Sequence, residues 1–169
     1  KLEVLRTMTK ACIVIPARLD SSRLPQKLLL NETGIPLIHH TFESAKQSNL
    51  ASDVVVATDS YEIYQSVKEK FGCQAVMQTR KHDCGTDRVI EAAYYLKMRD
   101  DYDIIVNLQG DMPIISGNCI DELIRSMDKA EIATLATEAD FIEFYDPSCV
   151  KVVCNRFSNA MYFSRSPIP

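Results

Sequence analysis

A cationic stretch, IPARLDSSRLPQK at residues 15–27, follows the first apolar run of the chain. Its polar side chains include three cations and two hydroxyl groups, from Arg18, Arg23, Lys27, Ser21 and Ser22. Guanidinium groups hold phosphate oxygens in bidentate pairs, and a lysine adds a point charge. Two prolines restrict the backbone of the same loop. We interpret the stretch as a phosphate cradle, with a solvated basic loop as the alternative.

Asp111 is the second candidate, because it ends the apolar run DIIVNLQGD between Gly110 and Pro113. A carboxylate in this place suits a hard cation such as Mg²⁺. This ion takes one or two protein oxygens and completes its octahedron with phosphate oxygens and water. A simple Gly-Asp turn is the alternative. A phosphate cradle facing Asp111 would favour the metal interpretation.

The segment CGTDR at residues 84–88 is the third candidate, because it precedes a helical pattern. The amide groups and the positive dipole end of a helix N-terminus attract anions. In the alternative interpretation, Cys84 or Thr86 is only an N-cap and Arg88 is only an exposed charge. The chain contains neither G-x-G-x-x-G nor G-x-x-x-x-G-K-[ST], which argues against a dinucleotide dehydrogenase and a P-loop enzyme.

The elements that must position these residues follow from the hydrophobic pattern. Apolar runs rich in β-branched residues predict strands at 11–16, 53–59, 73–77, 103–111, 131–137, 149–154 and 160–164. Helical periodicity predicts helices at 36–48, 61–71, 87–97 and 119–130. Continuous apolar strands that alternate with helices indicate a doubly wound α/β fold, with a mostly parallel sheet and helices on both faces.

Ligands of such sheets bind beyond the carboxyl ends of the strands. The segments that follow the first four predicted strands are therefore the informative ones. They are residues 18–27, Asp59, KHDCGTDR at 81–88 and QGDMP at 109–113. All three candidates lie in these segments, so we expect them to share one site.

The composition predicts a single domain over residues 1–169, with 46% apolar and 25% charged residues. Residues 1–7 lack a packing pattern, so Met8 is a candidate for the natural start and residues 1–7 for a cloning remnant. After residue 27, the chain carries 13 Lys/Arg against 21 Asp/Glu, which disfavours a nucleic-acid partner. The absence of a membrane-length apolar run and of a signal peptide favours a cytoplasmic protein. Six cysteines without a C-x-x-C pair favour reduced, mostly core-filling thiols.

Several long motifs in register resemble one family, the CMP-Kdo synthetases or 3-deoxy-manno-octulosonate (Kdo) cytidylyltransferases. The motifs are IPARLDSSRLPQK, VVVATDS, HDCGTDR, IIVNLQGDMPII, PSCVKVV and MYFSRSPIP. The resemblance implies a Rossmann-like fold of the nucleotide-diphospho-sugar transferase type. It also implies cytidylyl transfer from CTP to Kdo, with release of pyrophosphate, for lipopolysaccharide synthesis. Mg²⁺ is the implied cofactor and a homodimer the implied assembly, with no membrane or nucleic-acid partner.

The resemblance also implies roles for individual residues. Arg18, Ser21, Arg23 and Lys27 would hold the CTP phosphates, with Cys84, Gly85 and Arg88 beside the nucleotide. Gln109 would lie between the nucleotide and the sugar, Asp111 would hold Mg²⁺, and Arg165 would face the sugar acid. Arg18, Lys27 and Asp111 would be the catalytic residues. Two alternatives stay open, which are a non-catalytic nucleotide-binding fragment and a cytidylyltransferase for another acidic sugar.

The chain departs from the family pattern at three positions and in its length. Lys81 replaces a frequent acidic residue, Cys84 a usual serine and Met112 a usual glutamate. Family members continue beyond the segment SRSPIP, and the further portion carries a second metal-binding aspartate and more sugar contacts. We therefore expect a domain that is incomplete at its C-terminal end, either a fragment or a naturally short relative.

Overall fold

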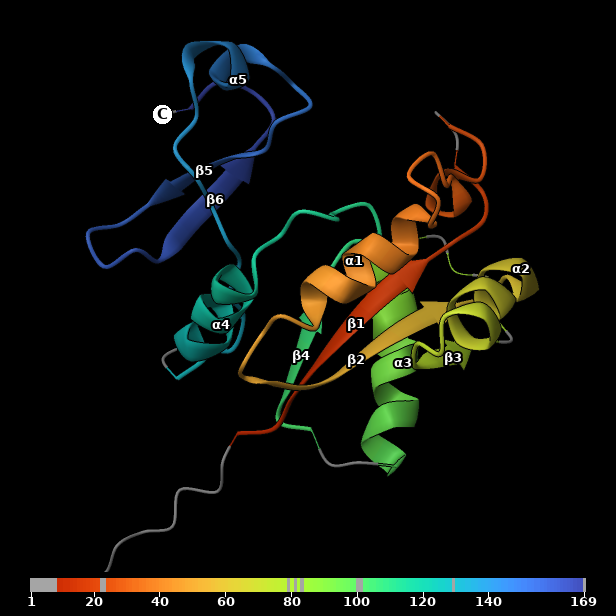
Figure 1. The fold of residues 1–169 in the computed structure, drawn as a ribbon. Helices are drawn as coiled ribbons and strands as arrows, with labels where there is room; N and C mark the ends of the chain where they lie inside the picture. Colours follow the sequence, from red (N-terminus) through yellow and green to blue (C-terminus); the bar gives the residue numbers. More distant parts are fainter. Residues whose placement is uncertain are drawn as a thin grey trace, which may run out of the picture. The chain divides into compact units, whose positions relative to one another are not determined.

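A four-stranded parallel sheet forms the centre of the first part of the chain (Figure 1). The computed structural model describes residues 9–21, 24–78, 80, 82, 84–99, 102–128 and 130–168. The strands are β1 (Ala11–Ala17), β2 (Ala51–Thr58), β3 (Ala75–Met77) and β4 (Ile104–Asn107). Their order is β3-β2-β1-β4, with Val14 opposite Val55 on one side and Asn107 on the other. β1 therefore lies inside the sheet, and its carboxyl end meets that of β4.

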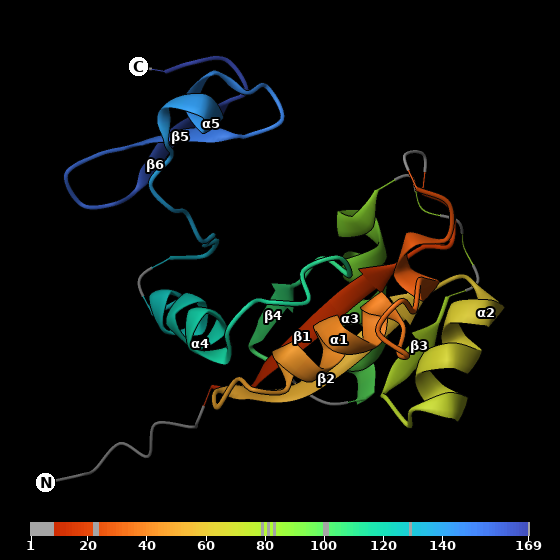
Figure 2. The same cartoon turned by 45° about the horizontal axis from the view of Figure 1, so that its top comes forward.

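Helices cover both faces of this sheet, as Figures 1 and 2 show. One face packs against α1 (Leu37–Ala45), α2 (Tyr61–Tyr64) with its π-helical extension η2 (Gln65–Lys70), and α4 (Gly117–Ser126). The other face packs against α3 (Gly85–Arg99). Ile13 and Ile15 of β1 enter the first core, while Cys12 and Val14 enter the second. The predicted doubly wound, mostly parallel fold is confirmed.

The remaining strands form an antiparallel hairpin of β5 (Lys151–Cys154) and β6 (Ala160–Ser164). A short helix, α5 (Phe141–Tyr145), precedes it and begins with a capping box of Asp140 and Glu143. The contacts divide the chain into two compact units, Lys1–Ala133 and Thr134–Pro169. The interpretation of residues 1–169 as a single domain stays a prediction.

The strand predicted at residues 131–137 is wrong, because the structure has no regular element there. Apolar residues recur in this stretch, but no neighbouring strand pairs with it. Ile132 is 89% exposed and Leu135 is 42% exposed, so the apolar side chains have no core to enter. The stretch instead spans the boundary between the two units.

The six cysteines are all free thiols, as predicted. Only Cys12 and Cys73 are buried, so core filling accounts for two of them rather than most. Burial raises the pKa of the Cys73 thiol to about 11, which keeps it protonated at neutral pH. Within the described part of the chain, no helix has the length and apolar character needed to cross a bilayer.

Candidate functional site

The loop after β1 and the loop after β4 enclose a cavity of about 330 Å³. Five of the predicted site residues line it, namely Arg18, Ser21, Lys27, Gln109 and Asp111. Pro16, Asp20, Leu24, Leu28 and Gly110 complete the lining. The cavity lies at the carboxyl ends of two adjacent parallel strands, where the sequence predicted a ligand site.

The backbone of the first loop reaches Lys27 through a left-handed turn. Gln26 has φ 51° and directly precedes the short 3₁₀ helix η1 (Lys27–Leu29). A side chain other than glycine rarely adopts this conformation, and such strain is typical of ligand-binding loops. Leu28 is buried in the core, so η1 is anchored while Lys27 faces the cavity.

Lys27 and Asp111 form an ion pair across this cavity. The Lys27 Nζ donates to Asp111 Oδ2 at 2.7 Å, and the two side chains are 38% and 43% exposed. The pair joins the phosphate-cradle candidate to the metal candidate, 84 residues apart in sequence. The basic loop is thus directed at a carboxylate, which the alternative of a purely solvated loop does not require.

α1 fixes the loop that carries Asp111. The Thr41 hydroxyl donates to the carbonyl oxygen of Gly110 at 2.8 Å, and Ser44 donates to the carbonyl oxygen of Pro113. Gly110 also packs closely, since a Cβ atom there would lie 3.2 Å from side-chain carbons of Leu28. Sequence reasoning missed Thr41 and Ser44. The available signal was a pair of hydroxyl residues three positions apart in a helix that faces the sheet.

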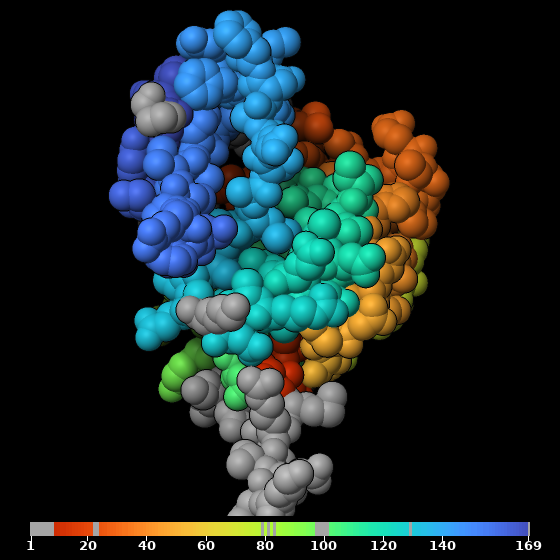
Figure 3. Space-filling view, turned by 90° about the vertical axis from the view of Figure 1, so that its left-hand side faces the viewer, coloured from red at the N-terminus to blue at the C-terminus, as the bar shows by residue number. Residues whose placement is uncertain are grey.

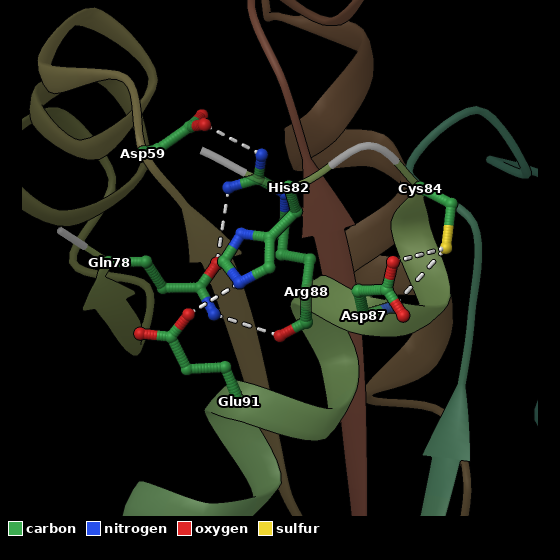
Figure 4. Close-up of polar contacts among 7 residues, drawn as sticks. All are labelled: Asp59, Gln78, His82, Cys84, Asp87, Arg88 and Glu91. Carbon is green, nitrogen blue, oxygen red and sulfur yellow. Dashed lines mark hydrogen bonds and ion pairs between the residues drawn. The ribbon is translucent and has the colours of Figure 1, made fainter. Parts of the chain in front are cut away.

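The N-terminus of α3 lies beside the same cavity. A Cβ atom on Gly85 would be 3.5 Å from both Pro16 Cγ and Gln109 Oε1. Cys84 precedes Gly85 and acts as an N-cap, because its Sγ accepts from the Asp87 amide at 3.4 Å and donates to the Asp87 carboxylate (Figure 4). The N-cap interpretation of Cys84 therefore holds beside the predicted nucleotide role, which stays a prediction.

Arg88 is buried, which corrects the alternative interpretation as an exposed helix charge. Its Nη2 donates to Asp59 at 2.8 Å and its Nη1 donates to Gln78 Oε1 at 3.1 Å (Figure 4). The Gln78 amide returns a hydrogen bond to the Arg88 carbonyl oxygen at 2.8 Å. Sequence reasoning noted Asp59 at a strand end but missed Gln78, which follows β3 in the same way.

Arg88 lines a second cavity, of about 530 Å³, together with Arg18 and Asp59. His82 also lines it and pairs through Nε2 with Glu91, as Figure 4 shows. Arg18 lines both cavities, so the two cavities lie next to one another and share this cationic residue, which directly follows β1. Arg18 is exposed and makes no hydrogen bond or ion pair with another described residue.

Asp111 fits the predicted magnesium site as a single protein ligand. Its carboxylate faces the cavity and already interacts with a cation, the Lys27 ammonium group. No group of three His, Cys, Asp or Glu side chains within the described ranges could hold a metal alone. Mg²⁺ commonly binds through one or two carboxylates plus substrate phosphates, so the donor set suits an ion that arrives with a nucleotide.

The other predicted residues lie elsewhere. Arg165 belongs to the second unit, where its Nη1 donates to the carbonyl oxygens of Pro147 and Ser148 at 2.9 and 3.0 Å. Met112 is 41% exposed beside Asp111. Arg23 and Lys81 lie outside the described residues. The phosphate-binding role of Arg23 therefore stays a prediction, and so does the effect of Lys81, which replaces a frequent acidic residue of the family.

In a comparison with known protein families, residues 12–169 match a family model described as cytidylyltransferase. A 3-deoxy-manno-octulosonate cytidylyltransferase of Escherichia coli is 45% identical over 165 residues, covering 96% of this chain and 65% of that protein. The protein of the same name from Coxiella burnetii (strain RSA 493 / Nine Mile phase I) is also 45% identical, covering 93% of this chain and 64% of that protein. The chain thus spans slightly less than two thirds of these relatives.

Solved structures of a cytidylyltransferase and of a related synthetase resemble this chain in the same way. A structure described as CMP:2-keto-3-deoxy-manno-octonic acid synthetase complexed with CTP superposes with a TM-score of 0.84 at 43% identity. It covers 95% of this chain, which in turn covers 66% of it. A cytidylyltransferase from Leptospira borgpetersenii gives a TM-score of 0.60 at 26% identity, covering 73% of this chain and 51% of that structure.

Proposed function

Because this chain belongs to the cytidylyltransferase family, we propose that the protein carrying it transfers a cytidylyl group from CTP to Kdo and releases pyrophosphate. The observation that carries the proposal is the cavity in which Arg18, Ser21 and Lys27 face Asp111. The printed names of the relatives support CTP and Kdo as the substrates.

The side chains around the cavity suit in-line attack of a sugar hydroxyl on the α-phosphate of CTP. This chemistry depends on positioning and on charge neutralisation more than on a nucleophile and base of the protein. Arg18 and Lys27 would bind the phosphate oxygens of CTP. The Gln109 amide lines the same cavity and would orient the reacting groups. Asp111 would hold Mg²⁺, which supplies further neutralisation and lowers the pKa of the attacking hydroxyl.

Lys27 has to exchange partners for this chemistry. In the free protein its ammonium group is bound to Asp111, while CTP offers it phosphate oxygens of higher charge. The exchange would release the Asp111 carboxylate for the metal ion that accompanies the nucleotide. Lys27 and Asp111 would therefore bind one another in the free protein, and would bind the CTP phosphates and the metal ion, respectively, in the substrate complex.

The proposal extends to the sugar and to the biological setting. Arg165 is the proposed partner of the Kdo carboxylate, since a guanidinium group pairs with carboxylates in a bidentate manner. The product would serve lipopolysaccharide synthesis in the cytoplasm, and the native protein would be a homodimer. These parts rest on the family membership.

A pyrophosphate-release assay with the native protein, CTP, Mg²⁺ and Kdo tests the proposed function. We expect pyrophosphate only when all three are present, and little or none when UTP or ATP replaces CTP. N-acetylneuraminate in place of Kdo is the matched acidic-sugar control. Release with that sugar but not with Kdo would identify a cytidylyltransferase for another acidic sugar, and CTP binding without any release would contradict an enzymatic role.

A further inference from the structure

Lys151 is a buried cation within the apolar strand β5. It is 7% exposed, although lysine is almost never buried without partners. Its Nζ donates to the carbonyl oxygens of Asp146 and Cys149, both at 2.8 Å, and of Arg165 at 2.7 Å. The three donors of the ammonium group are therefore all used, which satisfies the desolvated charge.

These three bonds join the two ends of the hairpin region. Asp146 and Cys149 precede β5, whereas Arg165 follows β6 directly. The Arg165 side chain returns across the same junction, because its Nη1 donates to Pro147 and Ser148. The Lys151 side chain thus binds the backbone of Arg165. The Arg165 side chain in turn binds the backbone of the segment 146–149, to which Lys151 also donates hydrogen bonds.

This arrangement leaves one edge of the Arg165 guanidinium group available. Both of these hydrogen bonds come from Nη1, so the Nε and Nη2 edge retains its donors. That edge has no hydrogen-bond acceptor within the described second unit, and Arg165 is exposed. Parallel Nε–H and Nη2–H donors form the fork that matches the two oxygens of a carboxylate.

We propose that Lys151 is a positioning residue, which fixes Arg165 so that its Nε–Nη2 edge is presented to the carboxylate of an acidic sugar. The inference rests on the proposed function for the identity of the ligand. The internal geometry, however, belongs to the second unit alone. The restriction of the Arg165 side chain by Lys151 does not depend on the proposed function, and it can be measured separately.

Side-chain NMR on protein labelled with ¹⁵N-arginine provides that readout. In the wild type, we expect the Arg165 Nε–H group to be rigid on the nanosecond timescale, and in Lys151→Met to become mobile. Arg156→Met is the matched control, since Arg156 lies in the hairpin turn and stacks on Phe157 at 4.7 Å from the ring centroid. A mobile Arg165 in the wild type would overturn the proposal even if Lys151→Met does not fold.

Kinetics on the native protein test the functional part. We expect Lys151→Met to raise KM for Kdo about tenfold or more, with KM for CTP unchanged, because one charged contact is lost. Lys151→Met combined with Arg165→Met should be no worse than Arg165→Met alone. Equal changes in both KM values, or additive effects in the double variant, would overturn the proposal.

The two experiments separate the two claims. A wild-type protein that is inactive with Kdo contradicts the proposed function, while the NMR result still decides whether Lys151 positions Arg165. Normal kinetics for Lys151→Met, with a rigid Arg165 in that variant, overturn the inference and leave the proposed function standing.

Discussion

Lys27 and Asp111 neutralise one another in the free protein, so each blocks part of the other's binding capacity. Both side chains are more than one third exposed, and pairs of this kind contribute little to stability. The pair is therefore better suited to exchange with a ligand than to holding the fold together.

Replacement of Lys27 by Met should change the affinity for two ligands in opposite directions. Loss of a charged phosphate contact should weaken CTP binding by roughly tenfold or more in calorimetry. Binding of Mn²⁺ without nucleotide, measured by electron paramagnetic resonance, should strengthen because Asp111 has lost its internal partner. Lys68→Met, on η2 and away from the cavity, is the control. Unchanged CTP affinity would return the loop to the solvated-surface interpretation.

Replacement of Asp111 by Asn should affect catalysis far more than folding. The amide keeps the shape but lacks the charge that a hard cation prefers, so turnover of the native protein should fall roughly 100-fold or more. The thermal midpoint should hardly move, because the lost ion pair is half exposed. Activity close to wild type over a magnesium titration would contradict the metal assignment.

The residue types near the cavity were predictable from the sequence, whereas their internal partners were not. Arg18, Lys27 and Asp111 follow buried strands, and a parallel sheet brings strand ends together whatever the loops do. The pairing of Arg88 with Asp59 depends on the packing of α3 against β2, which no local pattern records. Lys151 gave a signal, a charge inside an apolar strand, but its three carbonyl partners depend on the hairpin geometry.

At the scale of elements, α4 is fastened to the loop between α1 and β2. Figure 3 shows α4 lying against the segment that connects α1 to β2, and two residues one turn apart on α4 make the contact. Gly117 approaches the backbone of Gln47 and Ser48, while the buried Asp121 carboxylate accepts hydrogen bonds from this loop. The contact has both a steric and an ionisable part, which can be tested separately.

Asp121 should make stability depend on acid. Burial raises the pKa of its carboxyl, but hydrogen bonds from Ser48, Leu50 and Asn49 outweigh burial and lower the pKa overall. Because the folded value lies below the unfolded value, this stabilisation is present above about pH 4 and is lost as the pH falls through the folded pKa.

We therefore expect Asp121→Asn to lower the free energy of unfolding at pH 7 by about 1–3 kcal/mol in urea titrations. The curves of variant and wild type should begin to approach one another below about pH 4 and converge as the pH falls through the folded pKa of Asp121, where the wild-type carboxyl becomes protonated. Glu122→Gln, the adjacent exposed carboxylate, is the control. A constant difference between Asp121→Asn and wild type down to pH 2 would contradict the ionic origin.

Gly117→Ala tests the steric part of the same contact. The added Cβ would lie 2.2 Å from the carbonyl oxygen of Gln47 and 2.3 Å from its carbon, so backbone must shift. We expect a loss of about 1–3 kcal/mol in the free energy of unfolding. Asn118→Ala, at the exposed neighbouring position, should be neutral or slightly stabilising because alanine favours helix. Equal stability of the two variants would show that the loop yields freely.

The elements with strong periodicity were predictable, and those that depend on distant partners were not. Ile13 and Val14 belong to opposite cores, and their continuous apolar run correctly indicated a strand buried on both faces. Leu135 lies in a stretch that is also rich in apolar residues, but a strand forms only where a neighbour supplies hydrogen bonds. Gln26 adopts its left-handed conformation without glycine, so the turn before η1 had no local signature.

At the scale of the whole molecule, the two cavities described above belong to the first unit. All residues that line the two cavities belong to Lys1–Ala133. Residues 130–140 connect this unit to the second without regular structure, and nearly all of their side chains are exposed. Such connecting segments are preferred sites of proteolysis.

Limited proteolysis should therefore cut within residues 130–140 and leave an amino-terminal fragment that still binds CTP. We expect its affinity in calorimetry to be within about threefold of the uncut chain, since the proposed phosphate-binding residues and Asp111 remain together. CTP added before the protease should protect the loop at residues 18–27 but not the connecting segment. Loss of CTP binding after the cut would show that the second unit contributes to the nucleotide site.

The carbonyl cluster around Lys151 resembles, in its chemistry, the shells of oxygen dipoles that coordinate alkali ions. Here the cation is covalently attached to the strand that it stabilises, so its effective concentration at the cluster is high and constant. Sodium or potassium from the surrounding medium has no place to fill. We therefore expect the order of this segment to depend little on the salt content of the solution, because salt screens buried charges much less than exposed ones.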